Sequence, residues 1–540
     1  MIRTPQLLLA AAMMLIAPAL TADGPQRAAA DEGGGVPPAS TERLDQPPVP
    51  EPGIAAKLGQ PAKVERNGFV SVQVNVAFDG SNVVGDAANE PSIAVDPNAP
   101  LRMAIGWRQF DSIASNFREA GWSWSADGGR SWAERGTLDN GVFRSDPVLA
   151  SDAEGRFYYY SLVSPPTGEI LCDMFISEDH GESWFGPIAA YGGDKAWFAI
   201  DSTGGPGHGS LYLAWTQASN EFGNRTFIRS FDRGLSYTEP VATLPTPTWG
   251  TLAVGIEGEL YIAGNANYDR DRFVIKRAVD AADPGSPSAF DTFFADLGGA
   301  QGFGGDIPGP TPNPGGLLGQ VWIVADHSGG PNRGNLYLAS SVNPPGADPQ
   351  DVHFARSTDG GETWSEPVRI HADDRGAWQW FATMSIAPDG RLDVVWVESL
   401  DSGAPNVGEL YYARSFNGGV SWTQPVAVSP PFDSWLGWPQ QDKLGDYYHM
   451  ISDLVGADLA YAATFNGEQD VYYLRIGDTD CNSNGVADGI DLRLGLVDCN
   501  DNGLIDRCEI AAGTAEDGDG DGVIDACRIA PRRSGRRLSP

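Results

Sequence analysis

The chain has 540 residues, of which 41% are hydrophobic, and it is rich in glycine (67), proline (40) and tryptophan (16). This turn-rich and aromatic-rich composition is typical of all-β proteins. Acidic residues (71) outnumber basic ones (36) for a net charge of −35, and a surface of that sign repels nucleic acid and anionic membranes. We therefore exclude nucleic acid as a partner and expect an exported, cation-binding protein.

The first residues predict an export signal. Arg3 supplies a positive start, and the apolar run LLLAAAMMLIAPAL is too short to span a bilayer comfortably. Cleavage at Ala22 gives a signal peptide over 1–22, with an uncleaved membrane anchor as the alternative. No later stretch of the sequence is long and apolar enough for a membrane span, so we expect a secreted, extracellular or cell-surface protein.

Residues 23–68 are rich in Pro, Gly and charge, and they predict a disordered linker. The segment FVSVQVNVAF over 69–78 then alternates apolar and polar residues, which predicts a strand. We expect this strand to complete the last repeat of the chain and to close a ring of sheets, which removes exposed sheet edges.

A short turn motif recurs along the following segment. The copies SADGGRSW, SEDHGESW, SFDRGLSY, STDGGETW and SFNGGVSW begin at residues 125, 177, 230, 357 and 415. They lie about 50 to 60 residues apart except for one interval of about twice that, so we expect a unit with a decayed motif between 245 and 315. The Ser and Asp side chains suit hydrogen bonds to the hairpin backbone, and the final aromatic ring suits packing between sheets. We interpret the motif as structural rather than catalytic.

Each unit contains short alternating apolar runs separated by turns, as in SIAVDPNAPLRMAIGWR, and the motif follows the third strand. Repeats of this length with several strands each predict a β-propeller, because one blade cannot bury both of its faces alone. We count seven blades, with six as the alternative. The predicted units begin near Glu90, Asp146, Asp194, Trp249, Trp322, Trp380 and Asp446.

The repeated turns resemble the Asp-box, or bacterial neuraminidase, repeats of sialidase-like propellers. The resemblance covers about residues 69–477 and implies an all-β, sialidase-like β-propeller with the boxes on the outer rim, away from the active site. It also implies an arginine trio whose first member sits in an Arg-Ile-Pro motif on the first inner strand. The comparable stretch here is NEPSIAV, with Glu90 near the arginine position. Since an anion there would repel a substrate carboxylate, we do not expect true sialidase activity.

Ligands of propellers bind at the mouth of the central channel, where the inner strands begin and where loops follow the second strands. Aromatic rings there suit stacking on sugars, and paired carboxylates suit glycoside hydrolysis. The candidate catalytic residues are Glu398, Asp146 and Asp194. The candidate ligand-binding residues are Glu90, Arg108, Trp197, Trp249, Trp322, Trp380, Asp446 and Tyr447. The alternative is that these residues only cap the strands that line the channel.

After Gly477 the composition changes to three acidic repeats, DCNSNGVADGID, DCNDNGLIDRCE and DGDGDGVIDACR. Each has oxygen-bearing side chains at positions 1, 3, 5 and 9 and Gly at position 6, the arrangement of a Ca²⁺ loop. Position 12 is acidic in the first two repeats but is Arg528 in the third. The predicted Ca²⁺ ligands are Asp480, Asn482, Asn484, Asp488, Asp491, Asp498, Asn500, Asn502, Asp506, Glu509, Asp517, Asp519, Asp521 and Asp525. The alternative is a disordered acidic tail.

These repeats resemble the EF-hand-like loops of dockerin and thrombospondin type 3 segments. Their close spacing leaves little room for dockerin helices, so a protein partner for the module over 478–528 stays open. The four cysteines of this module predict two disulfides with three alternative pairings, and Cys172 of the propeller is left as a buried thiol. A basic tail follows over 529–540.

Together these features predict a secreted propeller that binds extracellular glycans and carries structural calcium. Whether it is also a glycosidase-type enzyme stays open. The alternative is a non-catalytic surface propeller that binds glycan or protein.

Overall fold

The computed structural model describes residues 58–59, 63–164, 170–217, 220–371, 375–401, 403–500, 502 and 504–528. The predicted signal peptide over 1–22, most of the predicted linker and the tail over 529–540 lie outside the described residues. Within the described ranges, no helix is long and apolar enough to cross a membrane.

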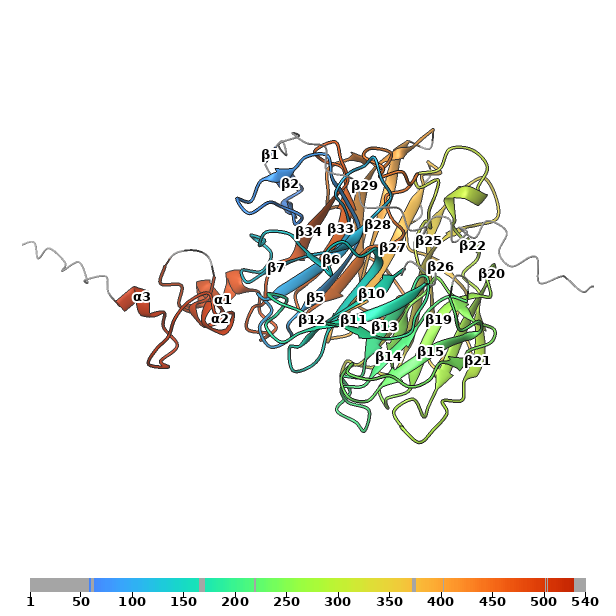
Figure 1. The fold of residues 1–540 in the computed structure, drawn as a ribbon, viewed down its shortest axis with the longest axis horizontal. Coiled ribbons are helices and arrows are strands. Elements are labelled where there is room, and N and C mark those ends of the chain that lie inside the picture. Colours follow the sequence, from blue (N-terminus) through green and yellow to red (C-terminus); the bar gives the residue numbers. More distant parts are fainter. Residues whose placement is uncertain are drawn as a thin grey trace, which may run out of the picture.

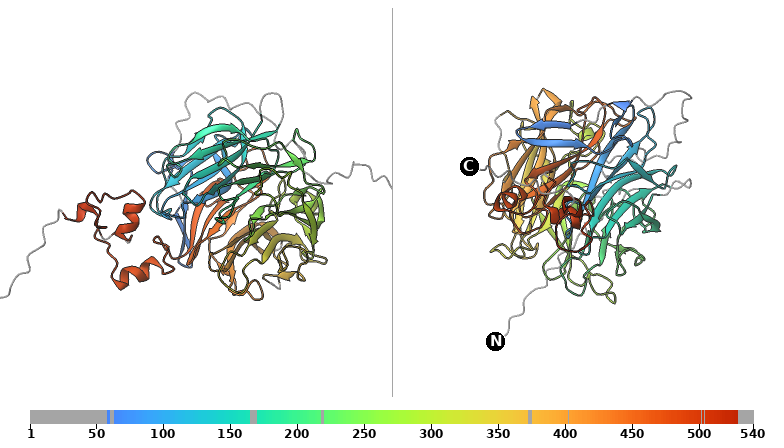
Figure 2. Two further views of the ribbon diagram at one scale, coloured as in Figure 1. Left: turned by 90° about the horizontal axis from the view of Figure 1, so that it is seen from below. Right: turned by 90° about the vertical axis from the view of Figure 1, so that its left-hand side faces the viewer.

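Seven antiparallel sheets of four or five strands form the blades of a propeller (Figures 1 and 2). Blade one consists of β5 (Ala87–Val95), β6 (Met103–Phe110), β7 (Glu119–Ser125) and β8 (Gly136–Leu138). Blade two consists of β9 (Arg144–Ser151), β10 (Phe157–Val163), β11 (Leu171–Ser177) and β12 (Phe185–Ala189). Blade three consists of β13 (Trp197–Ile200), β14 (Leu211–Ala214), β15 (Arg225–Ser230) and β16 (Val241–Ala242). In these blades the inner strand comes first in the chain, and the following strands step outwards.

The next three blades carry split or additional strands. Blade four consists of β17 (Pro247–Thr248), β18 (Leu252–Val254), β19 (Leu260–Ala266), β20 (Asp269–Ala278) and β21 (Asp291–Ala295). Blade five consists of β22 (Ala300–Gln301), β23 (Trp322–Ala325), β24 (Leu336–Asn343), β25 (Asp351–Ser357) and β26 (Val368–Arg369). Blade six consists of β27 (Gln379–Ile386), β28 (Leu392–Asp401), β29 (Ala404–Ser415), β30 (Val426–Ala427) and β31 (Phe432–Asp433). A long segment between β22 and β23 interrupts the inner position of blade five, since both strands pair with β24.

The seventh blade joins the two ends of the propeller. Its strands from the C-terminal side are β32 (His449–Ser452), β33 (Gly456–Ala463) and β34 (Asp470–Gly477), and β3 (Phe69–Gln73) pairs with β34. The prediction that the segment 69–78 supplies the strand that closes the ring is therefore confirmed, although the strand ends at Gln73, and the count of seven blades is confirmed as well. The six-bladed alternative is wrong.

One boundary differs from the prediction. β2 (Lys63–Arg66) pairs with β3 and extends blade seven outwards, and β1 (Leu58–Gly59) pairs with β4 (Asn82–Val83). The propeller therefore begins before residue 69. The strand KVER has too little apolar character to be recognised alone, but the turn Asn67–Gly68 that follows it has φ values of 53° and 87°. An Asn-Gly pair with two positive φ angles is the two-residue hairpin signal that marks this strand.

The five repeated turns fold alike, as the structural interpretation requires. In the first box, Ser131 N and Oγ donate to the two carboxylate oxygens of Asp127 at 3.0 and 2.6 Å, and Gly129 N donates to Ser125 Oγ at 3.0 Å. The next three boxes repeat these bonds. In the last box Asn417 replaces Asp, accepts from Ser421 N at 3.0 Å and donates its Nδ2 hydrogen to Ser421 Oγ at 2.9 Å. Trp132, the final residue of the first box, lies 5.6 Å from the ring of Tyr473 in blade seven. The box aromatics thus join neighbouring sheets.

The C-terminal segment forms a small module with the short helices α1 (Asp488–Leu494), α2 (Asp506–Ala511) and α3 (Asp525–Arg528), and it projects from one side of the propeller (Figure 1). Two disulfides, Cys481–Cys508 and Cys499–Cys527, link its repeats, which selects one of the three pairings. Leu101, in the turn between β5 and β6, packs against Cys481, Cys508 and neighbouring apolar residues. Cys172 is buried as a free thiol, as expected.

Candidate functional site

The inner strands begin with a bend that turns side chains towards the propeller axis. Glu90, Asp146, Lys195, Trp249 and Phe381 have φ values of 50°, 47°, 49°, 55° and 57°, in the left-handed region. This backbone conformation costs free energy for a non-glycine residue and persists only where the surrounding structure holds it in place. Because the same bend recurs in five blades, it belongs to the architecture of the hub, and the identity of each side chain decides what the hub contains.

Six charged residues from four blades meet at this hub. They are Glu90, Arg108, Asp146, Lys195, Lys443 and Asp446, here called the hub cluster, and all are buried. Lys195 Nζ lies 3.1 Å from Asp146 Oδ2 and 2.6 Å from Asp446 Oδ2, and Lys443 Nζ lies 2.7 Å from Asp446 Oδ2. Arg108 lies 3.2 Å from Glu90. The cluster therefore contains three acidic and three basic side chains in mutual contact.

The surroundings shift the pKa values of the three acidic side chains in different directions. Burial raises the pKa of Glu90 to about 8, although Arg108 and Lys195 oppose the shift. Burial acts in the same direction on Asp146 and Asp446, but the ammonium of Lys195 beside both outweighs it and holds their pKa values below normal. The surroundings therefore raise the pKa of Glu90 and lower the pKa values of Asp146 and Asp446.

Two interlocked segments cover the mouth of the hub. The first, residues 302–321, is inserted between β22 and β23, and the second, residues 434–446, joins β31 to β32; together they are called the lid. Asn313 Nδ2 donates to Gly445 O at 2.8 Å, and Leu444 N donates to Asn313 Oδ1 at 2.8 Å. Leu317 N donates to Asp446 Oδ1 at 2.9 Å. The lid therefore holds the hub cluster directly.

The aromatic residues predicted to stack on sugars are packed inside the protein. Trp197 contacts Trp322 and Tyr447 edge-to-face, each with ring centroids 5.4 Å apart. Trp249 stacks on Phe303 of the lid, and Trp380 packs on its neighbour Phe381. All the predicted rings are at most 6% exposed. These rings are packed against one another or against neighbouring rings, so they offer no open stacking face at the mouth.

The other two predicted catalytic acids are not members of the hub cluster. Glu398, at 1% exposure, accepts hydrogen bonds from Arg375, from Trp396 Nε1 at 3.2 Å and from Gln379 Nε2 at 3.4 Å. All three partners come from blade six or the segment leading into it. Asp194 is buried directly before Lys195. The structure thus brings Asp146, Asp446, Glu90 and Arg108 together and gives Glu398 its own set of partners.

Several residues at the hub were not predicted as site residues. Lys443 completes the hub cluster, and the lid carries two half-buried tryptophans, Trp435 and Trp438, with ring centroids 6.4 Å apart. Trp435 Nε1 donates to Thr311 O at 3.1 Å, and Trp438 Nε1 donates to Ser434 O at 2.8 Å. The signal in the sequence was DSWLGWPQQDKLGD, where two tryptophans stand in a loop of turn-forming residues.

The first two acidic repeats of the module fold as loops whose predicted ligands converge. In the first, Asn482 and Asn484 each donate an amide hydrogen bond to Asp491 Oδ2 at 2.8 Å, so positions 3, 5 and 12 meet. In the second, Asn502 lies 2.8 Å from Glu509, also at position 12. Asp488 Oδ2 and Asp506 Oδ2, both at position 9, are buried without a hydrogen-bond partner within the described residues. This donor set fits Ca²⁺, which takes six to eight oxygen ligands.

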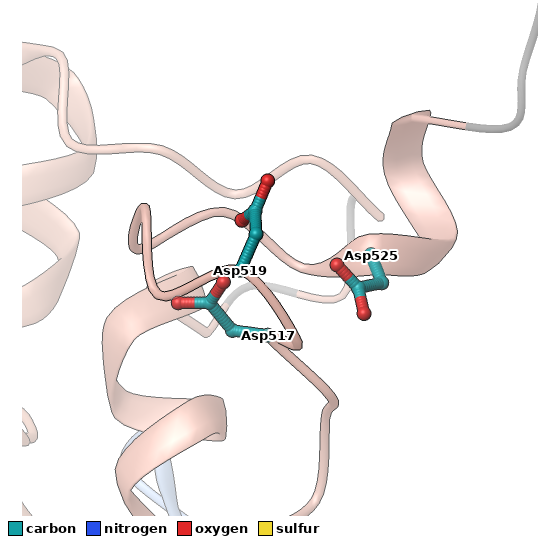
Figure 3. A group of neighbouring side chains, drawn as sticks. All are labelled: Asp517, Asp519 and Asp525. Atoms are coloured by element: carbon teal, nitrogen blue, oxygen red, sulfur yellow. The ribbon is translucent and has the colours of Figure 1, made fainter.

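The third repeat gathers three carboxylates. Side-chain oxygens of Asp517, Asp519 and Asp525 lie within 4.8 Å of one another (Figure 3). Asp517 also accepts hydrogen bonds from the loop backbone, including Gly522 N at 2.8 Å. With Arg528 at position 12 of the sequence, this loop has fewer oxygen donors than the first two.

One repeat-family model matches a short segment of the chain. The BNR/Asp-box repeat model matches residues 355–366, which include the fourth box. No curated protein has a sequence that matches this chain.

Several solved structures resemble the chain at low identity. A protein of unknown function from Dyadobacter fermentans has 12% identity and a TM-score of 0.42, over 77% of this chain and 99% of that one. The phage phi92 endosialidase has 11% identity and a TM-score of 0.42, over 76% and 69%. A Trypanosoma rangeli sialidase has 11% identity and a TM-score of 0.36, over 77% and 59%. The blade count given above comes from the strand pairing of this chain alone.

Proposed function

We propose that this protein is an exported recognition propeller that binds extracellular carbohydrate on the lid side and uses its hub cluster for structure rather than for catalysis. The single observation that supports the proposal is that the acidic side chains of the hub cluster are buried in ion pairs. Asp146 and Asp446 share the ammonium of Lys195 beneath the lid. A hydrolytic acid pair needs an open space between its carboxyl groups for the glycosidic bond, and here buried cations and the lid fill that space.

The lid supplies a surface of suitable chemistry for sugar binding. Trp435 and Trp438 are half-buried, and their indole N–H groups are fixed by backbone carbonyls. Leu436 between them is 40% exposed. Rigid aromatic rings with partly free faces bind ligands at low entropic cost.

Glycan binding tests this proposal. We expect saturable binding of the wild-type protein on a glycan array, and a loss of at least about tenfold in affinity for Trp435→Ala and Trp438→Ala. Trp422→Ala is the matched control, because it removes a half-buried tryptophan from an Asp-box at the other end of the blades. Equal binding by Trp435→Ala, Trp438→Ala and the wild type would contradict the assignment of the lid.

Glycoside hydrolysis is the second candidate, and the titration of the hub favours it. The pKa of Glu90 is raised while those of the neighbouring Asp146 and Asp446 are lowered, and acid–base catalysis uses carboxyl groups whose pKa values are separated in this way. Turnover of any glycan by the wild type, with loss in Glu90→Gln, would support this candidate over the first.

We further propose that the C-terminal loops bind Ca²⁺ and that the ion stabilises the module. Calorimetry with about 10 mM CaCl₂ against EGTA should show a gain of about 1–3 kcal/mol for each filled loop, given the affinities typical of extracellular modules. Asp480→Ala and Asp498→Ala should each remove part of this gain. Asp517→Ala, in the loop without an acidic position 12, is the control and should remove less. A melting curve that does not respond to Ca²⁺ would exclude this role.

A further inference from the structure

The central channel contains a chamber at the end opposite the lid. The inner strands all begin at the lid and run away from it, and residues from blades two to seven line a cavity of about 210 Å³. Its lining includes Ala150, Ser385 and Ile386 near the far ends of β9 and β27, which are only half-buried. The hub cluster seals the other end of the channel. The chamber is therefore reached from the Asp-box end of the propeller.

Aromatic rings separate the chamber from the hub cluster. Trp197, Trp322 and His449 line the cavity, and their rings lie in contact, with Trp322 stacked on His449 at 5.9 Å and an interplanar angle of 19°. The remaining lining side chains are apolar except for Thr251 and Ser385. None of the side chains that line the cavity is ionised at neutral pH, because burial lowers the pKa of His449 to about 4.

The hydrogen bonds of His449 fix which ring nitrogen carries the proton. Ser92 Oγ accepts from Leu149 N at 2.8 Å and lies 2.8 Å from His449 Nδ1, so its hydroxyl hydrogen is available to that nitrogen. Ile93 N also donates to Nδ1 at 3.3 Å. With two donors, Nδ1 acts as the acceptor, and the neutral ring carries its hydrogen on Nε2. The described contacts of His449 do not engage Nε2, so the chamber contains one side-chain N–H donor beside an aromatic wall.

We propose that this chamber binds one neutral, planar aromatic molecule that carries a hydrogen-bond acceptor for His449 Nε2–H. The size fits, because a cavity of about 150 Å³ in another protein admits benzene, and this one is somewhat larger. Charged molecules are excluded because the lining offers no counter-charge to offset their desolvation. The site lies at the other end of the channel from the lid surface and does not depend on the proposed glycan binding.

The test uses two probes of similar shape, acetophenone with an acceptor and ethylbenzene without one. We expect saturable quenching of tryptophan fluorescence by both, with acetophenone bound about three- to tenfold more tightly because of one hydrogen bond. His449→Phe should remove this preference while ethylbenzene binding changes little. Isothermal titration calorimetry on the same samples gives the stoichiometry, which should be one.

A channel-filling variant keeps the test decisive if His449→Phe does not fold. Ala150→Phe places a ring in the chamber from its half-buried rim and should weaken both probes at least tenfold. Ala153→Phe is its matched control, since Ala153 is exposed in the turn after β9. Failure of both probes to saturate, or equal binding by Ala150→Phe and Ala153→Phe, would overturn the site. An unchanged preference for acetophenone in a folded His449→Phe would overturn the role of the histidine.

Discussion

Replacing Lys195 with Met should destabilise the protein by about 3–5 kcal/mol at pH 7, because it removes one partner of buried ion pairs and leaves carboxylates without compensation. Lys195 Nζ contacts both Asp146 and Asp446, and all three side chains are almost fully buried. Lys443 remains beside Asp446 in the variant, so the larger penalty falls on Asp146. Chemical denaturation followed by tryptophan fluorescence measures the loss.

The pH dependence of this variant separates charge from packing. In the wild type, the lowered pKa values of Asp146 and Asp446 contribute stability that is present above their unfolded values and is lost as pH falls below them. Without Lys195, burial dominates and raises these pKa values, so the penalty is largest at neutral pH and shrinks as the carboxyls take up protons. The stability difference between wild type and Lys195→Met should therefore narrow between pH 7 and pH 5.

Lys276→Met is the matched control for Lys195→Met. Lys276 is equally buried, but its Nζ donates to Leu244 O and to Thr292 Oγ1, which are neutral, and burial lowers its pKa to about 8. Its removal should cost about 1 kcal/mol or less. A similar loss in both variants, independent of pH, would contradict the ion-pair account of the hub.

Replacing Tyr473 with Ala should cost about 3–5 kcal/mol, because the ring fills the junction between the last and first blades. Tyr473 on β34 packs against Trp132 of the first box, and a Cβ added at Gly129 would lie 2.2 Å from the tyrosine ring. Its hydroxyl donates to the buried Asp458 at 2.7 Å. The substitution therefore opens a cavity and removes a hydrogen bond at the point where the ring closes. Urea unfolding measures the cost.

Tyr191→Ala is the control for Tyr473→Ala. Tyr191 also lies against an aromatic ring, that of Phe222 at 5.3 Å, but it is half-exposed and remote from the closure. Its removal should cost well under half as much. If both substitutions had the same small effect, the junction of the first and last blades would not be a main source of stability.

The repeat architecture could be predicted from the sequence because it depends on local, recurring signals. The box at Ser125–Trp132 recurs at similar intervals except for one gap of about twice the length, and the alternation over 69–78 predicted the strand that pairs with the last blade. Blade four was inferred from the spacing alone, and the structure has its strands β17 to β21 there. Strand β2 was not predicted because its four residues show no alternation of apolar and polar side chains. The Asn67–Gly68 pair that follows it is nevertheless a signal for a two-residue hairpin turn.

The contents of the site were harder to predict, because they depend on contacts between distant segments. Inner-strand positions such as Asp146 and Trp197 could be placed at the hub from the repeat. Two other contacts depend on how two irregular segments fold over the ring of blades. They are the ion pair between Lys443 and Asp446 and the hydrogen bond between Asn313 and Gly445 in the lid that covers the mouth. The aromatic rings predicted to face a ligand are therefore buried in the protein interior instead. The disulfide pairing could likewise be determined only from the three-dimensional structure.

The most direct test of this account is a crystal structure of the protein with an oligosaccharide selected from the glycan array. We predict a sugar ring stacked on Trp435 or Trp438, with Lys195 still joined to Asp146 and Asp446 beneath an unchanged lid. A sugar bound within the hub, in contact with Glu90 and Asp146 and with residues 302–321 displaced, would contradict it.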